Sequence, residues 1–335
     1  MDVPTWVWWT TIVVTVSVLL FDVVVLGRRP HEPSTKEVSF ALTLYVGLAI
    51  AFGVGVWLIA GHQFGTEFFA GWLTEYSLSV DNLFIFLIIM TRFGVPRDYQ
   101  QEALLVGIVI ALVMRGIFIA VGAAAINQFS WVFYLFGLFL VYTAVKLAKG
   151  GTNDDDDYQK SPLVTWVETH LPATDRWNGV KVLARENGKR VVTPMFIVVL
   201  ALGTTDLLFA LDSIPAIYGL TEEPYLVLTA NIFALMGLRQ LYFLIGGLLR
   251  RLVYLSYGLA VLLGFIGVKL VLHAMHENTL PFVNGGERIG WAPDISILVS
   301  LAVIVGVLAV TTVASLIASK RAVGRDEVRV VTSQD

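Results

Sequence analysis

Long runs of hydrophobic residues recur along the chain, separated by shorter polar segments. Nine of these runs reach, or nearly reach, the roughly 20 residues that an α-helix needs to cross about 30 Å of hydrocarbon. They lie at residues 6–26, 40–61, 68–91, 103–124, 129–148, 193–218, 224–247, 252–273 and 294–318. Because backbone in lipid must satisfy its own hydrogen bonds, we expect helices rather than strands. The pattern predicts an all-α, polytopic membrane protein with about nine transmembrane helices.

Composition supports this assignment, and charge adds an orientation. Of 335 residues, 56% are hydrophobic and 15% are charged, which is unlike an ordinary soluble domain. Eighteen of the 23 Lys and Arg residues fall in alternate connections, whereas the other connections hold only Arg288. Basic loops stay cytoplasmic, so the N-terminus is predicted outside and the C-terminus inside. The absence of cysteine excludes structural disulfides and thiolate metal sites.

A single transmembrane domain is predicted over residues 1–320, followed by a cytoplasmic tail at 321–335. The longest connection, 149–192, is also predicted to be cytoplasmic. It contains the acidic run Asp154–Asp157, which is typical of a solvated linker, with cation sensing as the less favoured alternative.

Two acidic motifs stand out inside hydrophobic segments. One reads Glu75-Tyr-Ser-Leu-Ser-Val-Asp81-Asn82, and the other reads Asp206-Leu-Leu-Phe-Ala-Leu-Asp212-Ser213. Each places two carboxylates six residues apart, followed by a small polar residue. Carboxylates inside a membrane are energetically expensive, so a duplicated acidic pair indicates a functional site.

Basic residues extend the duplication beyond the acidic motifs. The span after the first motif carries Arg115 and the next carries Lys146; after the second motif the corresponding residues are Arg239 and Lys269. The two units span residues 68–148 and 193–273. Three spans per unit is an odd number, so the second unit enters the membrane from the opposite side. This predicts an inverted repeat, which is common in secondary transporters.

The inversion also predicts which acids lie at the same depth. A two-fold axis in the membrane plane would pair Glu75 with Asp212, and Asp81 with Asp206. Six helical residues rise about 9 Å and turn by about 600°, so the two acids of one helix face directions about 120° apart. Either the helix is distorted, as Pro215 would allow, or the two layers are used in turn.

The predicted chemistry of the acids is the binding of a hard divalent cation, Mn²⁺, Ca²⁺ or Mg²⁺, by carboxylate, amide and hydroxyl oxygens. The candidate metal ligands are Glu75, Asp81, Asn82, Asp206, Asp212 and Ser213, with further oxygens from Ser77 and Ser79. The candidate coupling or charge-balancing residues are Arg115, Arg239, Lys146, Lys269 and Asp22. Protons and metal competing for the same carboxylates would give proton-coupled antiport. The alternative is a structural ion-pair network.

Two histidines near the end of the eighth span form a weaker candidate. His273 and His276, with Glu277, would lie at the outer mouth of a metal pathway. Polar residues that simply end a helix at the membrane interface are the commoner explanation.

The motifs resemble those of the TerC/Alx family of integral membrane proteins. The resemblance rests on the first acidic motif followed by Leu-Phe, on Phe209-Ala-Leu-Asp212-Ser213-Ile-Pro215-Ala, and on Lys269-Leu-Val-Leu-His273-Ala-Met-His276-Glu277-Asn. It covers most of the chain from Asp22 onward. The family was named for tellurium resistance, and the resemblance implies Mn²⁺ efflux across the plasma (inner) membrane. Manganese therefore follows from the family, whereas the residues themselves indicate only a hard divalent cation.

Three other functional classes compete with an exporter. An accessory protein would load metal into exported proteins, an intramembrane aspartyl protease would use two aspartates, and an amino-acid exporter would recognise a substrate carboxylate. The protease is disfavoured because the second motif reads Gly203-Thr-Thr-Asp206 rather than Gly-x-Gly-Asp. We expect no enzymatic activity, no resident cofactor and no nucleic-acid partner. The expected partners are the lipid bilayer, the metal ion and protons.

Overall fold

The computed structural model describes residues 3–26, 34–129, 131–150, 161–174, 176–177, 179, 181–186, 189–245, 254–278, 280, 283–293 and 295–332. The long helices are α1 (Thr5–Leu26), α2 (Thr35–Ala60), α3 (His62–Arg92), α4 (Arg97–Gln128), α5 (Val132–Gly150), α7 (Pro194–Tyr218), α8 (Pro224–Ile245), α9 (Leu255–His276) and α10 (Ile297–Thr332). The short elements are α6 (Pro162–His170), β1 (Leu183–Glu186), β2 (Lys189–Val192) and the 3-10 turn η3 (Asn284–Gly286).

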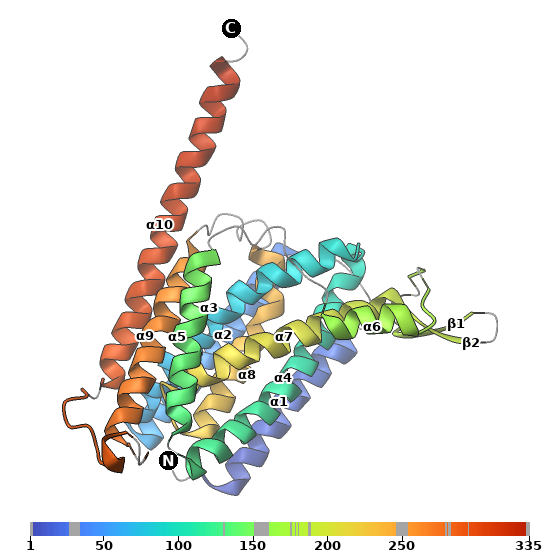
Figure 1. Cartoon of the computed structure of the whole chain (residues 1–335). Helices are drawn as coiled ribbons and strands as arrows, with labels where there is room; N and C mark the ends of the chain where they lie inside the picture. Colours follow the sequence, from blue (N-terminus) through green and yellow to red (C-terminus); the bar gives the residue numbers. More distant parts are fainter. Residues whose placement is uncertain are drawn as a thin grey trace.

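The predicted helical membrane architecture is confirmed. Among the described residues, eight helices are long and apolar enough to cross a membrane: α2, α3, α4, α5, α7, α8, α9 and α10. Helix α1 occupies the position of the predicted first span. Its apolar stretch within the described residues, Thr5–Val18, is shorter than any of those eight helices. The ninth span therefore stays a prediction. The chain ends lie at opposite ends of the bundle (Figure 1), as an odd number of crossings requires.

Local sequence signals set several helix ends. Ser34 and Thr193 cap α2 and α7 by accepting hydrogen bonds from Glu37 N and Phe196 N. Proline opens α7 and α8, where its missing N–H is tolerated. Helices α2 and α3 are joined through Gly61 alone, whose φ of 108° favours glycine.

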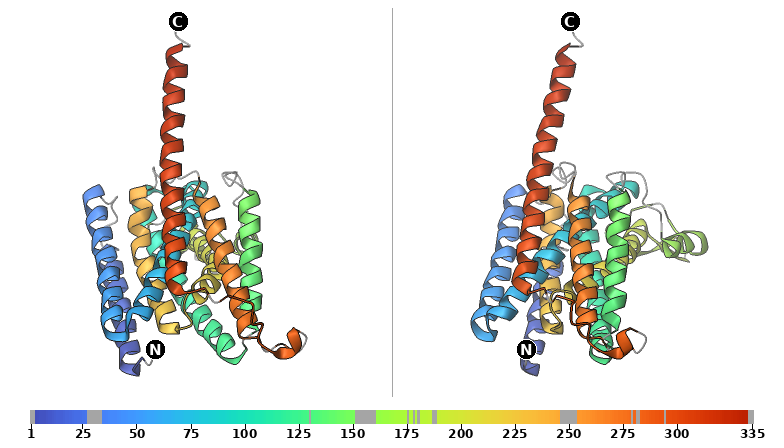
Figure 2. Two further views of the ribbon diagram at one scale, coloured as in Figure 1. Left: turned by 90° about the vertical axis from the view of Figure 1, so that its left-hand side faces the viewer. Right: turned by 60° about the vertical axis from the view of Figure 1, so that its left-hand side comes forward.

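Helices of the two predicted repeat units pack against each other in reciprocal pairs. Helix α3 packs on α8 and α4 packs on α7, while α5 and α9 form the most extensive pair. Helix α10 lies beside α9, as Figure 2 shows. Two units related by a two-fold axis would pack in this way, although the inverted repeat itself and its orientation in the membrane stay predictions.

Helix α3 is central to the hydrophobic core. Its buried residues join one cluster with α4, α7 and α8, a second with α5 and α9, and a third with α2 and α8. Large apolar side chains on the outer helices are instead exposed, including Leu58 and Ile59 of α2 and Val310 of α10. Apolar residues on the outside of a helical bundle are those expected to face lipid.

The structure adds two features that the sequence analysis did not predict. The connection 149–192 contains α6 and an antiparallel hairpin in which Leu183 pairs with Val192, and both project to one side of the bundle (Figure 1). Helix α10 continues to Thr332, so residues 321–332, assigned above to a tail, extend the last helix beyond the bundle. The acidic run Asp154–Asp157 lies outside the described residues.

Candidate functional site

Arg115 joins three helices in the interior of the bundle. Its Nε and Nη2 donate hydrogen bonds of 3.0 Å each to Oδ2 and Oδ1 of Asp206 on α7. Its Nη1 forms an ion pair with Glu75 Oε1 on α3 and lies 3.4 Å from Ser213 Oγ on α7. A paired, fork-like contact of this kind is the strongest geometry available to arginine and a carboxylate. The first acid of each motif is thus held by the arginine of the first unit.

This triad is removed from solvent and lipid. Arg115 and Glu75 are 0% exposed, and Asp206 is 1% exposed. Two carboxylates face one guanidinium, so one negative charge has no opposite charge within the triad when both acids are ionised. Uncompensated charge in a low-dielectric interior is strongly unfavourable. The arrangement favours the uptake of a proton or a cation.

Helix α3 buries further polar side chains within two turns of Glu75. Ser79 follows Glu75 by one helical turn and therefore lies on the same face. Ser77 and Ser79 are both buried, and neither Oγ has a hydrogen-bond partner among the described residues. Asn82, which follows Asp81, is also buried. These are oxygen atoms of the kind that hard cations take as ligands.

The second acids of the motifs are less buried than the first. Asp212 is half-buried, accepts a 3.0 Å hydrogen bond from Thr143 Oγ1 on α5, and interacts electrostatically with Lys146. Asp81 is also half-buried and has an interaction partner. The predicted pairings by depth, Glu75 with Asp212 and Asp81 with Asp206, therefore differ from the structure, which joins Glu75 to Asp206 through Arg115.

Helix geometry explains this difference. Helices α3 and α7 run continuously through both acids of their motifs, and α7 continues past Pro215 to Tyr218. The acids of one helix consequently keep their different directions, and the first acid of each motif contacts Arg115. Within the described residues, no group of three or more acidic, histidine or cysteine side chains is assembled as a metal site. The metal-ligand set predicted above is not gathered into one cluster in this structure.

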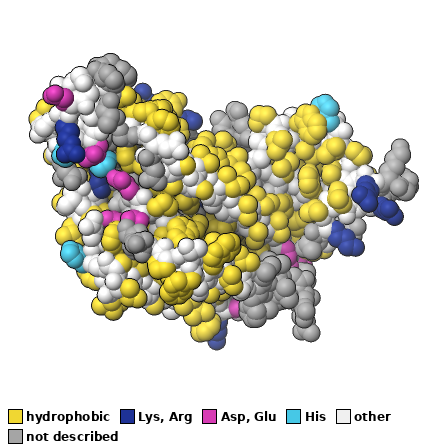
Figure 3. Space-filling model, turned by 90° about the horizontal axis from the view of Figure 1, so that it is seen from below, with side chains coloured by type: hydrophobic (Ala, Val, Ile, Leu, Met, Phe, Trp, Pro, Cys, Tyr) yellow, Lys and Arg dark blue, Asp and Glu magenta, His cyan; other side chains and the backbone are white. Residues whose placement is uncertain are grey.

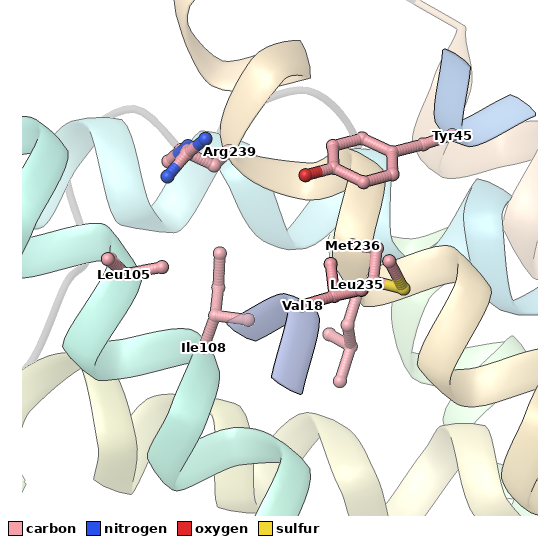
Figure 4. Close-up of a pocket in the computed structure, with 7 residues that line it drawn as sticks. All are labelled: Val18, Tyr45, Leu105, Ile108, Leu235, Met236 and Arg239. Carbon is pink, nitrogen blue, oxygen red and sulfur yellow. The ribbon is translucent and has the colours of Figure 1, made fainter. Parts of the chain in front are cut away.

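Arg239, the counterpart of Arg115, lies elsewhere. It lines a small pocket between α1, α2, α4 and α8, shown in Figure 4. The other lining residues are Val18, Tyr45, Leu105, Ile108, Leu235 and Met236. Arg239 has an interaction partner of its own, and Arg115 is the arginine that bridges Glu75 and Asp206.

The remaining charge-balancing candidates are dispersed. Lys146 is exposed on α5, and Lys269 is half-buried on α9 and has an interaction partner. Asp22 lies on α1, but its side chain is outside the described part of the structure. None of the described contacts brings these three residues to the triad.

The predicted outer mouth contains a small polar network. His273 Nε2 lies 3.1 Å from Glu222 Oε1, and this hydrogen bond lowers the pKa of the Glu222 carboxyl below its ordinary value. Glu277 lies 3.7 Å from His276 Nδ1 and 3.6 Å from Arg288 Nη2. Viewed from below, Figure 3 shows acidic, basic and histidine side chains gathered at one edge of a largely hydrophobic face.

Sequence reasoning missed the partners supplied by other helices. Thr143 and Glu222 became visible only through their contacts with Asp212 and His273. No motif marks Thr143. Glu222 carried a weak signal, as one of two adjacent acids in a short loop.

A family model described as "Integral membrane protein TerC family" matches residues 60–323. No solved structure matches the chain.

Three relatives illustrate the similarity. An uncharacterized membrane protein of Mycobacterium tuberculosis (strain ATCC 25618 / H37Rv) is 47% identical over 312 residues, covering 92% of this chain and 78% of that protein. An uncharacterized membrane protein of Myxococcus xanthus is 38% identical over 315 residues, covering 94% and 93%. A protein of Escherichia coli (strain K12), provisionally named membrane-bound redox modulator Alx, is 36% identical over 314 residues, covering 90% and 92%.

Proposed function

The chain belongs to the TerC family of integral membrane proteins, and from this premise we propose that it exports a divalent metal cation, Mn²⁺, in exchange for protons. The observation that carries the proposal is the buried triad of Glu75, Arg115 and Asp206. With both acids ionised, this buried triad inside a membrane-spanning bundle has one negative charge more than Arg115 balances, whereas a purely structural ion pair is expected to balance.

The imbalance suggests how cargo and protons exchange. When Arg115 holds both acids, the triad carries one net negative charge, which a single proton neutralises. When Arg115 moves away from Glu75, the freed carboxylate and nearby hydroxyl oxygens suit a hard divalent cation. Proton and metal then compete for the same carboxylate, which is the basis of antiport.

The proposed exporter uses both units of the repeat. Glu75 comes from the first unit and Asp206 from the second, so relative movement of the units changes the distance between the two acids. Rocking of one repeat against the other around a midplane site is a recurrent mechanism of secondary transport. The choice of manganese among hard cations rests on the family resemblance, and we place the protein in the plasma (inner) membrane.

The alternatives are less well supported. A protease would need two aspartates free to activate water, whereas Arg115 engages both oxygens of Asp206. A redox activity through thiols of this chain is excluded because it has no cysteine. An accessory protein that loads metal into exported proteins would bind metal without moving it across a membrane unaided.

Transport by the purified chain in proteoliposomes tests the proposal. We expect uptake of radioactive Mn²⁺ that responds to an imposed pH gradient, and an at least roughly tenfold loss of rate in Glu75→Gln or Asp206→Asn. The matched control is Glu67→Gln, because Glu67 is another buried acid of α3 but hydrogen-bonds to Thr221 away from the triad. Absence of flux with the wild-type chain would refute export and leave the accessory role. Equal losses in the control and test variants would refute the assignment of the site.

A further inference from the structure

Helix α8 carries a buried amide that belongs to no motif. Asn231 is 0% exposed, and neither its Oδ1 nor its Nδ2 has a hydrogen-bond partner among the described residues. Thr74 on α3 is likewise 0% exposed, with Oγ1 unpartnered there. Buried polar side chains in native proteins almost always have a partner, whether protein, water or ligand. Two such groups in one bundle therefore indicate a partner outside the described chain.

Asn231 lies midway between two regions where α8 approaches α4. Four residues before it, Val227 shares a hydrophobic cluster with Ile119 of α4. Four residues after it, Leu235 lines a pocket with Ile108 of α4, as Figure 4 shows. Residues four apart lie on roughly the same helical face, so Asn231 is directed toward α4 and its neighbours.

Arg115 lies between the same two regions on α4. It follows Ile108 by seven residues and precedes Ile119 by four. Because α8 meets α4 both near Ile119 and near Ile108, the part of α8 around Asn231 lies beside the part of α4 that carries Arg115.

Thr74 approaches this region from α3. A Cβ atom added at Gly71 would lie 3.3 Å from Ile217 of α7 and 3.6 Å from Ala230 of α8, so this face of α3 meets both helices. Thr74 is one turn further along the same face and immediately precedes Glu75. Thr74 therefore lies on the face of α3 that meets α7 and α8.

We propose that Asn231 and Thr74 are ligands of the transported cation, completing with neutral oxygens the site to which Glu75 contributes charge. This inference rests on the proposed function. It assigns a ligand to α8, a helix that carries neither acidic motif. The amide Oδ1 of Asn231 and the hydroxyl Oγ1 of Thr74 are hard ligands suited to Mn²⁺, Ca²⁺ or Mg²⁺. As neutral groups they add coordination without adding charge, so Arg115 can return to its acids after the ion leaves.

The assignment predicts opposite changes in stability and affinity. Asn231→Leu removes polar atoms that have no partner in the described protein, so the metal-free variant should unfold at the wild-type temperature or above it. The same change removes a ligand, so the Mn²⁺ concentration giving half-maximal flux should rise about tenfold or more. An amide that serves structure alone would lower the unfolding temperature and leave the half-saturating concentration unchanged.

Thr74→Val provides a second test with a matched control. Thr229 on α8 is also 0% exposed, but its Oγ1 donates a 2.8 Å hydrogen bond to the carbonyl of Tyr225 within the same helix. We expect Thr74→Val to raise the half-saturating Mn²⁺ concentration, whereas Thr229→Val should leave it within about twofold of wild type. Proteoliposome flux and thermal unfolding of the metal-free protein are measured for all variants.

The outcomes separate this inference from the proposed function. If the wild-type protein transports Mn²⁺ and the half-saturating Mn²⁺ concentration is unchanged in both Asn231→Leu and Thr74→Val, the ligand assignment alone is overturned. Water would then be the partner of these groups. No wild-type flux at all would overturn both. If Asn231→Leu fails to fold, the structural role of Asn231 is shown, and the ligand site is decided by Thr74→Val against its control.

Discussion

Replacing Arg115 with leucine tests the charge argument directly. The substitution leaves Glu75 and Asp206 buried, at 0% and 1% exposure, without the guanidinium that contacts both. Removing one partner of a buried ion pair typically destabilises a protein by about 3–5 kcal/mol, because the remaining charge has lost its compensation. At about 2 °C per kcal/mol for a chain of this size, Arg115→Leu should unfold roughly 6–10 °C below wild type.

Neutralising the acids in the same variant should reverse most of this loss. The triple variant Arg115→Leu, Glu75→Gln, Asp206→Asn removes the whole ionic set, and such replacements are often close to neutral. In the single variant, a cation that binds the freed acids stabilises the folded protein by about 2.7 kcal/mol at 100 times its Kd. Added Mn²⁺ should therefore raise the unfolding temperature of Arg115→Leu more than that of the triple variant.

Thermal unfolding in detergent or nanodiscs measures these effects, with Arg97→Leu as the control. Arg97 is an exposed arginine on the same helix, and surface substitutions usually change stability by less than about 0.5 kcal/mol. The reasoning is wrong if Arg115→Leu unfolds within 2 °C of wild type. It is equally wrong if the triple variant is no more stable than the single one.

Two further predictions concern packing and the outer loop. Gly137→Ala should destabilise the protein by about 1–3 kcal/mol, because the new Cβ would lie 2.8 Å from the carbonyl oxygen of Gly267 where α5 meets α9. At Gly116, by contrast, nothing lies within 4 Å of an added Cβ. Gly116→Ala should therefore be neutral or slightly stabilising in the same thermal-unfolding assay. Glu222→Gln should lower stability by its full amount above pH 4.5, the ordinary pKa of the carboxyl. Because the hydrogen bond from His273 lowers that pKa in the folded protein, the contribution is present above pH 4.5 and is lost as pH falls through the lowered value. A difference in unfolding temperature between wild type and Glu222→Gln that stays constant from about pH 6 to about pH 3 would contradict this linkage.

Much of the fold could be predicted because hydrophobic length is a local property. The eight spans 40–61 to 294–318 match helices α2 to α10, apart from the short α6, with ends that differ by several residues. The β1–β2 hairpin escaped prediction because strands of four residues are too short for a clear alternating pattern. The continuation of α10 past residue 320 also escaped, since the change to charged residues there indicated a tail.

The site could be predicted only in part. The two motifs singled out Glu75 and Asp206, and the repeat singled out Arg115, all of which meet in the structure. The pairing of acids by depth did not anticipate that Arg115 joins Glu75 to Asp206, because depth alone does not determine the direction in which a side chain points. Asn231 was missed because one amide in an apolar helix has no pattern around it.

By itself, the sequence determined which segments are apolar enough to enter a membrane and which of them carry charge. Both follow from the free energy of transferring each side chain into hydrocarbon, a property that needs no knowledge of neighbours. The tertiary structure decided which charges meet: helix crossing brings Arg115 to Glu75 and Asp206, whereas Asp212 accepts a hydrogen bond from Thr143. Contacts between helices depend on crossing and rotation, which arise from the packing of whole helical faces and are therefore not encoded in any one segment.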